Sequence, residues 1–200
     1  MPGPASGNNQ TGRNICFFLA APLVVPGDIN KINNAYARSG AAGDRFAIAD
    51  LERYITTDPG GVEGLADVEL GTGVFRVPAV TTASAYGSTT GSASVPRFCG
   101  PPISVPGSTT LTDLTIGIAP DYAETADQTY FTNFASTSIA DGSDVIVIVR
   151  IPGAGVSVSY NLVLGKISGL SIEHAVESVS THTRTVAPAA FLVGINKPAG

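Results

Sequence analysis

The second half of the chain alternates short apolar runs with turn-forming residues. The apolar run from Val145 to Val149 has no polar position, which is typical of a strand buried on both faces. Gly165 and Gly169 interrupt the next runs and predict a tight corner or a β-bulge. The strands expected in this half are Leu111 to Ala119, Gln128 to Phe134, Val145 to Ile151, Val156 to Leu164, Lys166 to Ile172 and His174 to Val186.

The first half contains the candidate helices and further strands. Ile48, Leu51 and Ile55 follow a spacing that places them on one helix face, and Asp44 is a suitable N-cap. We therefore expect one short helix packed on a sheet in that region. The helix candidates are Asp28 to Arg38 and Asp44 to Ile55, and the expected strands are Ile15 to Val25, whole or broken at Pro22, and Gly73 to Val80.

Two segments of small residues predict extended arms. The segment from Met1 to Gly12 has no large apolar side chain except Met1, so it needs a partner to order it. The segment from Thr81 to Thr110 is rich in Ser, Thr, Gly, Ala and Pro, and Arg97 is its only charge. We expect one domain over residues 1–200, with an N-terminal arm at about 1–14 and a long extended loop or arm at about 81–110.

Composition excludes several classes of protein. Charged residues make up 14% of the chain against about 25% in an average soluble domain, and 23 Gly and 14 Pro argue against a helical bundle. A hydrophobic content of 44% and a net charge of −5 argue against disorder. The chain has no cluster of Lys or Arg, which argues against tight binding of nucleic acid. The shortage of charge instead predicts a surface that a partner covers.

The longest apolar run does not predict a membrane span. It extends from Ile15 to Val25, is interrupted by Pro22, and has about half the length that a membrane helix needs. The run follows Arg13 and so also resembles the apolar core of a signal peptide, but we do not expect it to be a cleaved secretion signal.

No residue is assigned a catalytic, cofactor-binding or metal-binding role. His174 and His182 lie eight residues apart in one expected strand, about 27 Å from each other, so they cannot share a metal ion unless the strand folds back. We expect both to be surface or interface side chains. We expect solvated acids rather than a calcium loop or a carboxylate pair at Asp121, Glu124, Asp127, Asp141, Asp144, Glu173 and Glu177.

Two other signals carry little chemistry. Cys16 and Cys99 are far apart in the sequence, which favours buried or free thiols over a disulfide. The tripeptide Asn9-Gln10-Thr11 matches a glycosylation acceptor, which we expect to be silent without a secretory signal.

Three runs in the second half carry a resemblance to a known family. They are Leu111 to Ile116, Val145 to Pro152-Gly153, and Tyr160 to Ile172, and the expected strand from His174 to Val186 closes the pattern. Together with the preceding helix, this layout resembles the major tail tube proteins of tailed bacteriophages. The resemblance covers about 75 residues and is a pattern of strands, without a diagnostic motif.

The resemblance implies a mainly β subunit with a β-sandwich or barrel-like tail tube fold, one short flanking α-helix and extended arms. It implies hexameric rings that stack into a hollow tube in the virion tail, assembled in the host cytoplasm. The implied partners are further copies of the chain, other tail proteins, and genomic DNA that passes through the lumen without specific binding. Six copies would carry a charge of about −30 per ring, which would repel DNA phosphates. The family has no catalytic residues, and the resemblance implies neither a cofactor nor a membrane partner.

Other functions remain open from the sequence. A capsid decoration protein, or another viral or filament structural subunit, would likewise need no catalytic residue. A carbohydrate-binding β-sandwich would usually expose aromatic side chains, but the chain has no Trp. An enzyme would need a convergent polar pocket, which no motif in the sequence indicates.

Overall fold

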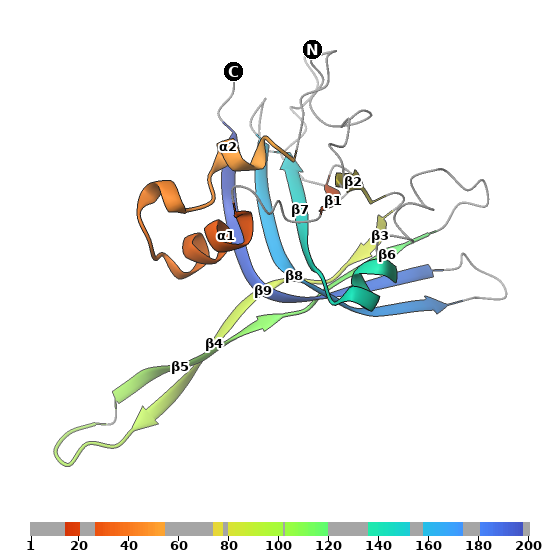
Figure 1. The fold of residues 1–200 in the computed structure, drawn as a ribbon. Coiled ribbons are helices and arrows are strands. Elements are labelled where there is room, and N and C mark those ends of the chain that lie inside the picture. The colour runs from red at the N-terminus through yellow and green to blue at the C-terminus, as the bar shows by residue number, and fades with distance from the viewer. Residues whose placement is uncertain are drawn as a thin grey trace, which may run out of the picture.

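Figure 1 shows a strongly curved sheet, helices against one of its faces, and a two-stranded hairpin that projects away from it. The computed structural model describes residues 15–20, 27–54, 74–77, 80–101, 103–119, 136–152, 158–173 and 181–197. Its elements are β1 (Cys16–Ala20), α1 (Asp28–Ala37), a 3-10 turn (Ala42–Asp44), α2 (Ile48–Leu51), β2 (Val74–Arg76), β3 (Val80–Ala83), β4 (Gly87–Val95), β5 (Ile103–Thr112), β6 (Leu114–Ile118), a short helix over residues 136–141, β7 (Asp144–Pro152), β8 (Val158–Glu173) and β9 (Thr181–Lys197).

Seven of the strands form one antiparallel sheet in the order β2-β1-β7-β8-β9-β6-β3. The long strands β8 and β9, of 16 and 17 residues, hold its two halves together. The first half of β8 pairs with β7, whereas the first half of β9 pairs with β6. The sheet thereby curls into a half-barrel, which confirms the prediction of a mainly β, barrel-like fold.

The curl depends on a bend in β8 at Gly165. A Cβ atom at this position would lie 2.3 Å from the backbone oxygen of Ala187, so only glycine allows β9 to approach so closely. The β8–β9 register shifts at Gly165 and again between Ile167 and Gly169. These shifts confirm the predicted corner. The strands expected from Val156 to Leu164 and from Lys166 to Ile172 are one bent strand, β8, in the described residues.

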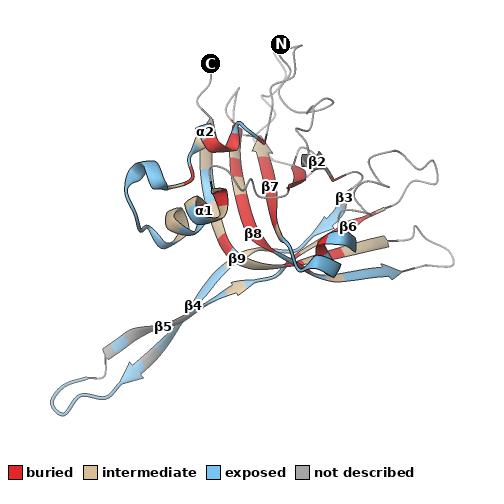
Figure 2. Cartoon of the chain, in the orientation of Figure 1, coloured by how far each residue is buried: buried red, intermediate tan, exposed pale blue. Residues whose placement is uncertain are grey.

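Apolar side chains fill both faces of the sheet, and Figure 2 shows the buried residues concentrated in its central strands. On the face that the helices cover, Phe18 and Ile148 pack with Leu51 of α2. On the other face, Phe17 and Val147 belong to the same cluster as Ile116. β1 and β6 are separated by three strands in the sheet, so their presence in one cluster means that the sheet curls around this second core.

The helical region differs from the prediction. The first candidate forms α1, but the second begins at the last residue of a 3-10 turn and contains a helix of only four residues, α2. Asp44 is exposed and does not cap α2; instead, the Asp50 carboxylate accepts a hydrogen bond from the backbone amide of Ala47. Leu51 is buried as expected and Ile48 packs against the core, while Ile55 lies outside the described residues.

Three predicted strands are also wrong in their extent. The strand expected from Leu111 to Ala119 is divided at Asp113 between the end of β5 and β6. The strand expected from Gly73 to Val80 is two strands, β2 and β3, at opposite edges of the sheet. The sequence has Pro78 between them, and proline cannot donate to a strand ladder. The strand expected from His174 to Val186 is wrong because β8 continues to Glu173 and β9 extends from Thr181 to Lys197.

Some expectations fall outside the described residues. They are the N-terminal arm at about 1–14 and the strand from Gln128 to Phe134. Among the helices of the described ranges, none is long and apolar enough to cross a membrane.

Candidate assembly surfaces

The hairpin formed by β4 and β5 projects from the sheet, and its described side chains are mainly exposed. Its strands pair from Gly87 opposite Thr112 to Val95 opposite Ile103, so β4 alone extends about 30 Å. Figures 1 and 2 show it leaving the sheet as a separate ribbon with mainly exposed residues. The sequence predicted an extended loop or arm from Thr81 to Thr110, and the described residues of this segment form an arm built mainly from strands.

Hydrogen bonds anchor the base of this hairpin to the sheet. The Ser84 hydroxyl donates to the backbone oxygen of Asp113 at 3.1 Å and accepts from the amide of Thr115 at 2.9 Å. The Asn161 side chain of β8 donates to the Tyr86 hydroxyl at 2.7 Å and accepts from the amide of Gly194 at 3.0 Å. These contacts fix the direction in which the hairpin leaves the sheet.

The tip of the hairpin, residues 95–101, combines apolar and cationic side chains. Phe98 has a relative exposure of 108% and Val95 of 43%. Arg97 lies between them and is exposed, as is the free thiol of Cys99. Burying an aromatic side chain of this kind contributes about 1.5–3 kcal/mol. An anchored arm that presents such a tip is well suited to bind another protein surface.

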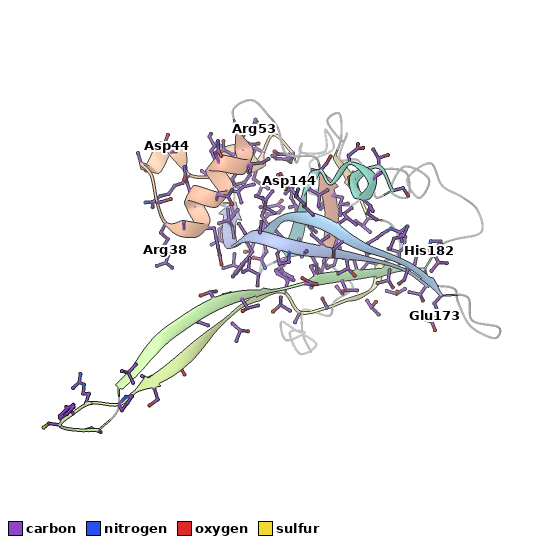
Figure 3. All side chains as sticks on the ribbon, turned by 60° about the horizontal axis from the view of Figure 1, so that its bottom comes forward. Arg38, Asp44, Arg53, Asp144, Glu173 and His182 are labelled. Atoms are coloured by element: carbon purple, nitrogen blue, oxygen red, sulfur yellow. The ribbon has the colours of Figure 1, made fainter. Side chains whose placement is uncertain are left out.

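A second apolar surface lies at the far end of β8, which we call the distal end and define as residues 170–173. Leu170 and Ile172 point to the same face and are 41% and 50% exposed. Glu173 ends the strand and is exposed. Figure 3, in which Glu173 and His182 are labelled, shows this end on the opposite side of the molecule from the hairpin tip.

The sheet also has two open edges. β2 and β3 are its outermost strands, and neither pairs on its outer side with another described strand. Both are short, of three and four residues, which limits unwanted pairing. These edges are further places at which a neighbouring subunit can bind.

Comparisons with known proteins found similarity among solved structures. No protein family matches the chain, and no curated protein matches it. Among solved structures, the chain is similar to the tail tube of phage SPP1, described as a hybrid structure by solid-state NMR and cryo EM. The TM-score is 0.41 at 10% sequence identity, and the match covers 69% of this chain and 72% of the SPP1 chain. This neighbour is a phage tail component.

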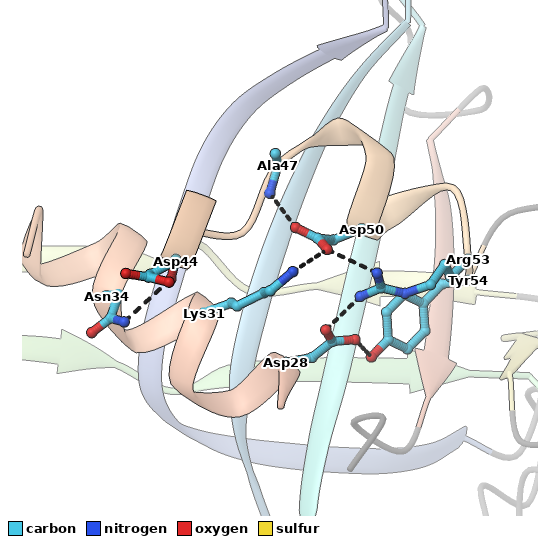
Figure 4. A network of polar contacts seen from close by, with 8 residues as sticks. All are labelled: Asp28, Lys31, Asn34, Asp44, Ala47, Asp50, Arg53 and Tyr54. Carbon is cyan, nitrogen blue, oxygen red and sulfur yellow. Dashed lines mark hydrogen bonds and ion pairs between the residues drawn. The ribbon is translucent and has the colours of Figure 1, made fainter. Parts of the chain in front are cut away.

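A buried polar network, drawn in Figure 4, joins α1 to the residues around α2. Asp28 at the start of α1 is fully buried and accepts hydrogen bonds from Arg53 and from the Tyr54 hydroxyl. Asp50 accepts hydrogen bonds from Lys31 at 2.7 Å and from Arg53 at 2.8 Å. The network therefore fixes the two helices relative to each other on the sheet.

The charges of this network support a structural role. Burial of the Asp50 carboxyl opposes its ionisation, but the hydrogen bonds from Lys31, Ala47 and Arg53 outweigh this effect and lower its pKa below 3.8. Burial likewise opposes the charge of Arg53, and its contacts with Asp28 and Asp50 raise its pKa above the usual value. Through these contacts with Lys31, Ala47 and Arg53, Asp50 joins α1 to the residues around α2.

The residues that the sequence analysis weighed for chemistry do not come together where they are described. His182 is in β9 opposite Ile172, Asp141 ends the short helix, and Asp144 begins β7. His182 lies near the start of β9, which begins at Thr181, so the prediction that one strand holds both histidines can be followed only for His182. Within the described ranges, no three His, Cys, Asp or Glu side chains are grouped as a metal site would require. The residues outside those ranges are Asn9, Asp121, Glu124, Asp127, His174 and Glu177.

Both cysteines are free, as the sequence predicted. Cys16 is buried in β1, and Cys99 is exposed at the hairpin tip.

The sequence patterns drew attention to Arg97, Cys99 and Glu173, but not to the apolar residues of the candidate surfaces, which are Val95, Phe98, Leu170 and Ile172. The signal for the tip was present, since Val95 and Phe98 are large apolar residues in a segment of small polar ones. Asp28 and Arg53 are 25 residues apart, and no local pattern links them.

Proposed function

We propose that this chain is a structural subunit of a bacteriophage tail, which self-assembles into stacked hexameric rings and forms the tube through which DNA leaves the virion. The observation that carries the proposal is the anchored hairpin with Phe98 exposed at its tip. The resemblance of Leu111 to Ile116 and Tyr160 to Ile172 to tail tube proteins supports the same role.

The exposed tip places a large apolar side chain, Phe98, in water. A fully exposed aromatic side chain on a long hairpin adds nothing to the packing of its own subunit, whereas it can contribute binding energy in an interface. A contact between two different surfaces of the same chain is heterologous, and it produces rings when its rotation closes. Rings that carry such arms can then stack.

The charge of the chain suits a conduit for DNA. The net charge is −5, and in a ring of six copies it would reach about −30. DNA affinity depends mainly on Lys and Arg contacts with phosphates, so an acidic assembly lets DNA pass without holding it. In this proposal the chain needs no cofactor, its other partners are tail proteins at the ends of the tube, and it has no enzymatic step.

Sedimentation velocity of the full chain over a range of concentrations tests this proposal. We expect a species of about six times 20.3 kDa, together with larger stacks that increase with concentration. A monomer at every concentration would contradict the proposal. A discrete oligomer that never stacks would instead favour a capsid decoration subunit.

A further inference from the structure

We propose that the hairpin tip of one copy docks on the distal end of β8 in the next copy. This inference rests on the proposed self-assembly and identifies the two surfaces that meet. The tip supplies Val95, Arg97 and Phe98, and the distal end supplies Leu170, Ile172 and Glu173.

The two surfaces are chemically complementary. Phe98 and Val95 are exposed apolar side chains, and so are Leu170 and Ile172. The charges are opposite: Arg97 is the only charged residue between positions 77 and 112, and Glu173 is exposed at the end of β8. The apolar side chains of the two surfaces can bury each other, which contributes affinity. The contact between Arg97 and Glu173 fixes the orientation of the two copies.

The faces of β8 allow both contacts at once. Leu170 and Ile172 are two residues apart and point to one face, while Glu173 alternates to the other face at the last position of the strand. A tip that straddles the end of β8 can place Phe98 against the apolar pair and Arg97 beside the carboxylate.

The placement of the two surfaces favours a second copy over a contact within the same chain. Figures 1 and 3 both show the hairpin tip and the distal end of β8 on opposite sides of the molecule. Asn161 and Ser84 anchor the hairpin base, so the arm is not free to fold back. Because tip and distal end are different surfaces, each docked copy leaves one of each available, and the contact propagates.

Cross-linking of the full chain tests the docking directly. Cys99 is an exposed thiol at the tip, Cys16 is buried, and Ser171 is an exposed position at the distal end. We expect Ser171→Cys treated with a short bis-maleimide to give a ladder of covalent oligomers above dimer. The matched control Glu52→Cys, also exposed but beside α2, should give no such ladder, and adding Cys99→Ser should abolish it.

A charge exchange supplies an independent measurement. We expect Arg97→Glu and Glu173→Arg each to weaken association about tenfold, and the double variant to restore it. Circular dichroism should be unchanged, since both side chains are exposed.

The outcomes separate this inference from the proposed function. If the wild-type chain assembles, but Ser171→Cys gives no ladder and the double charge variant does not restore association, the docking is wrong and self-assembly stands. If the wild-type chain does not assemble at all, the proposed function itself is wrong.

Discussion

Asp28 is the residue on which the packing of the two helices most depends. Its carboxylate is fully buried and is held by Arg53 and Tyr54, which follow it by 25 and 26 residues. Breaking this contact is costly, because Arg53 loses one of its two carboxylate partners and the Tyr54 hydroxyl loses the Asp28 oxygen to which it donates. The network therefore makes the position of α1 on the sheet sensitive to single substitutions.

We expect Asp28→Ala to lower the free energy of unfolding by about 3 kcal/mol, because it removes the acceptor shared by Arg53 and Tyr54. Urea unfolding followed by circular dichroism measures this loss. The control Asp44→Ala removes an exposed acid of the same region and should change stability by less than about 0.5 kcal/mol. Equal effects of the two substitutions would show that the network does not stabilise the fold.

Asp50 predicts a loss of stability in acid. Its pKa is lowered in the folded state, so its contribution is complete above the unfolded pKa of about 4 and is lost as the pH falls through the lowered folded pKa. We expect the unfolding free energy of the wild-type protein to fall more steeply below about pH 4 than that of Asp50→Asn. Parallel slopes in urea titrations at successive pH values would contradict this assignment.

At the scale of elements, the bend of β8 determines the shape of the sheet. Gly165 allows the close approach of Ala187, whereas Gly169 has a looser environment, in which a Cβ atom would lie 3.4 Å from Thr185. The two glycines are in the same strand and four residues apart, so they form a matched pair for substitution.

We expect Gly165→Val to prevent folding or to lower the melting temperature strongly, because its side chain would overlap the β9 backbone. Gly169→Ala should leave the melting temperature within a few degrees of wild type. Thermal denaturation of both variants measures the difference. A Gly165→Val protein as stable as Gly169→Ala would mean that the bend is not required.

The sequence predicts the elements whose pattern is local and strong. β7 follows from its apolar run, the bend follows from Gly165 and Gly169, and α1 follows from its helix signal. β4 and β5 were missed because Ser, Thr and Gly dominate their sequence and give no apolar alternation. Their pairing depends on long-range contacts that a local pattern does not encode.

The candidate surfaces, too, are predicted from the sequence only where the signal is local. The unusual segment over residues 81–110 is visible in the sequence as a candidate arm, but its hairpin form is not. The distal end could not be predicted, because the sequence placed His174 to Val186 in one strand, whereas β8 and β9 pair Glu173 with Thr181.

At the scale of the whole molecule, the exposed tip of the hairpin adds little to the packing of its own subunit, and the proposed docking assigns the tip to association. We expect Phe98→Ser to keep the folded monomer, since this side chain is fully exposed, and to weaken oligomers at least tenfold. Sedimentation velocity beside the control Ile139→Ser, another exposed apolar residue, measures the effect. Loss of oligomers in both variants, or in neither, would contradict a specific role of the tip.

Electron microscopy of the purified full chain tests the central claim most directly. The low charge, the anchored arm and the exposed tip together predict self-assembly. We expect hollow tubes in which class averages of end views show sixfold rings. Dispersed single copies at high protein concentration, with no rings or tubes, would contradict the account.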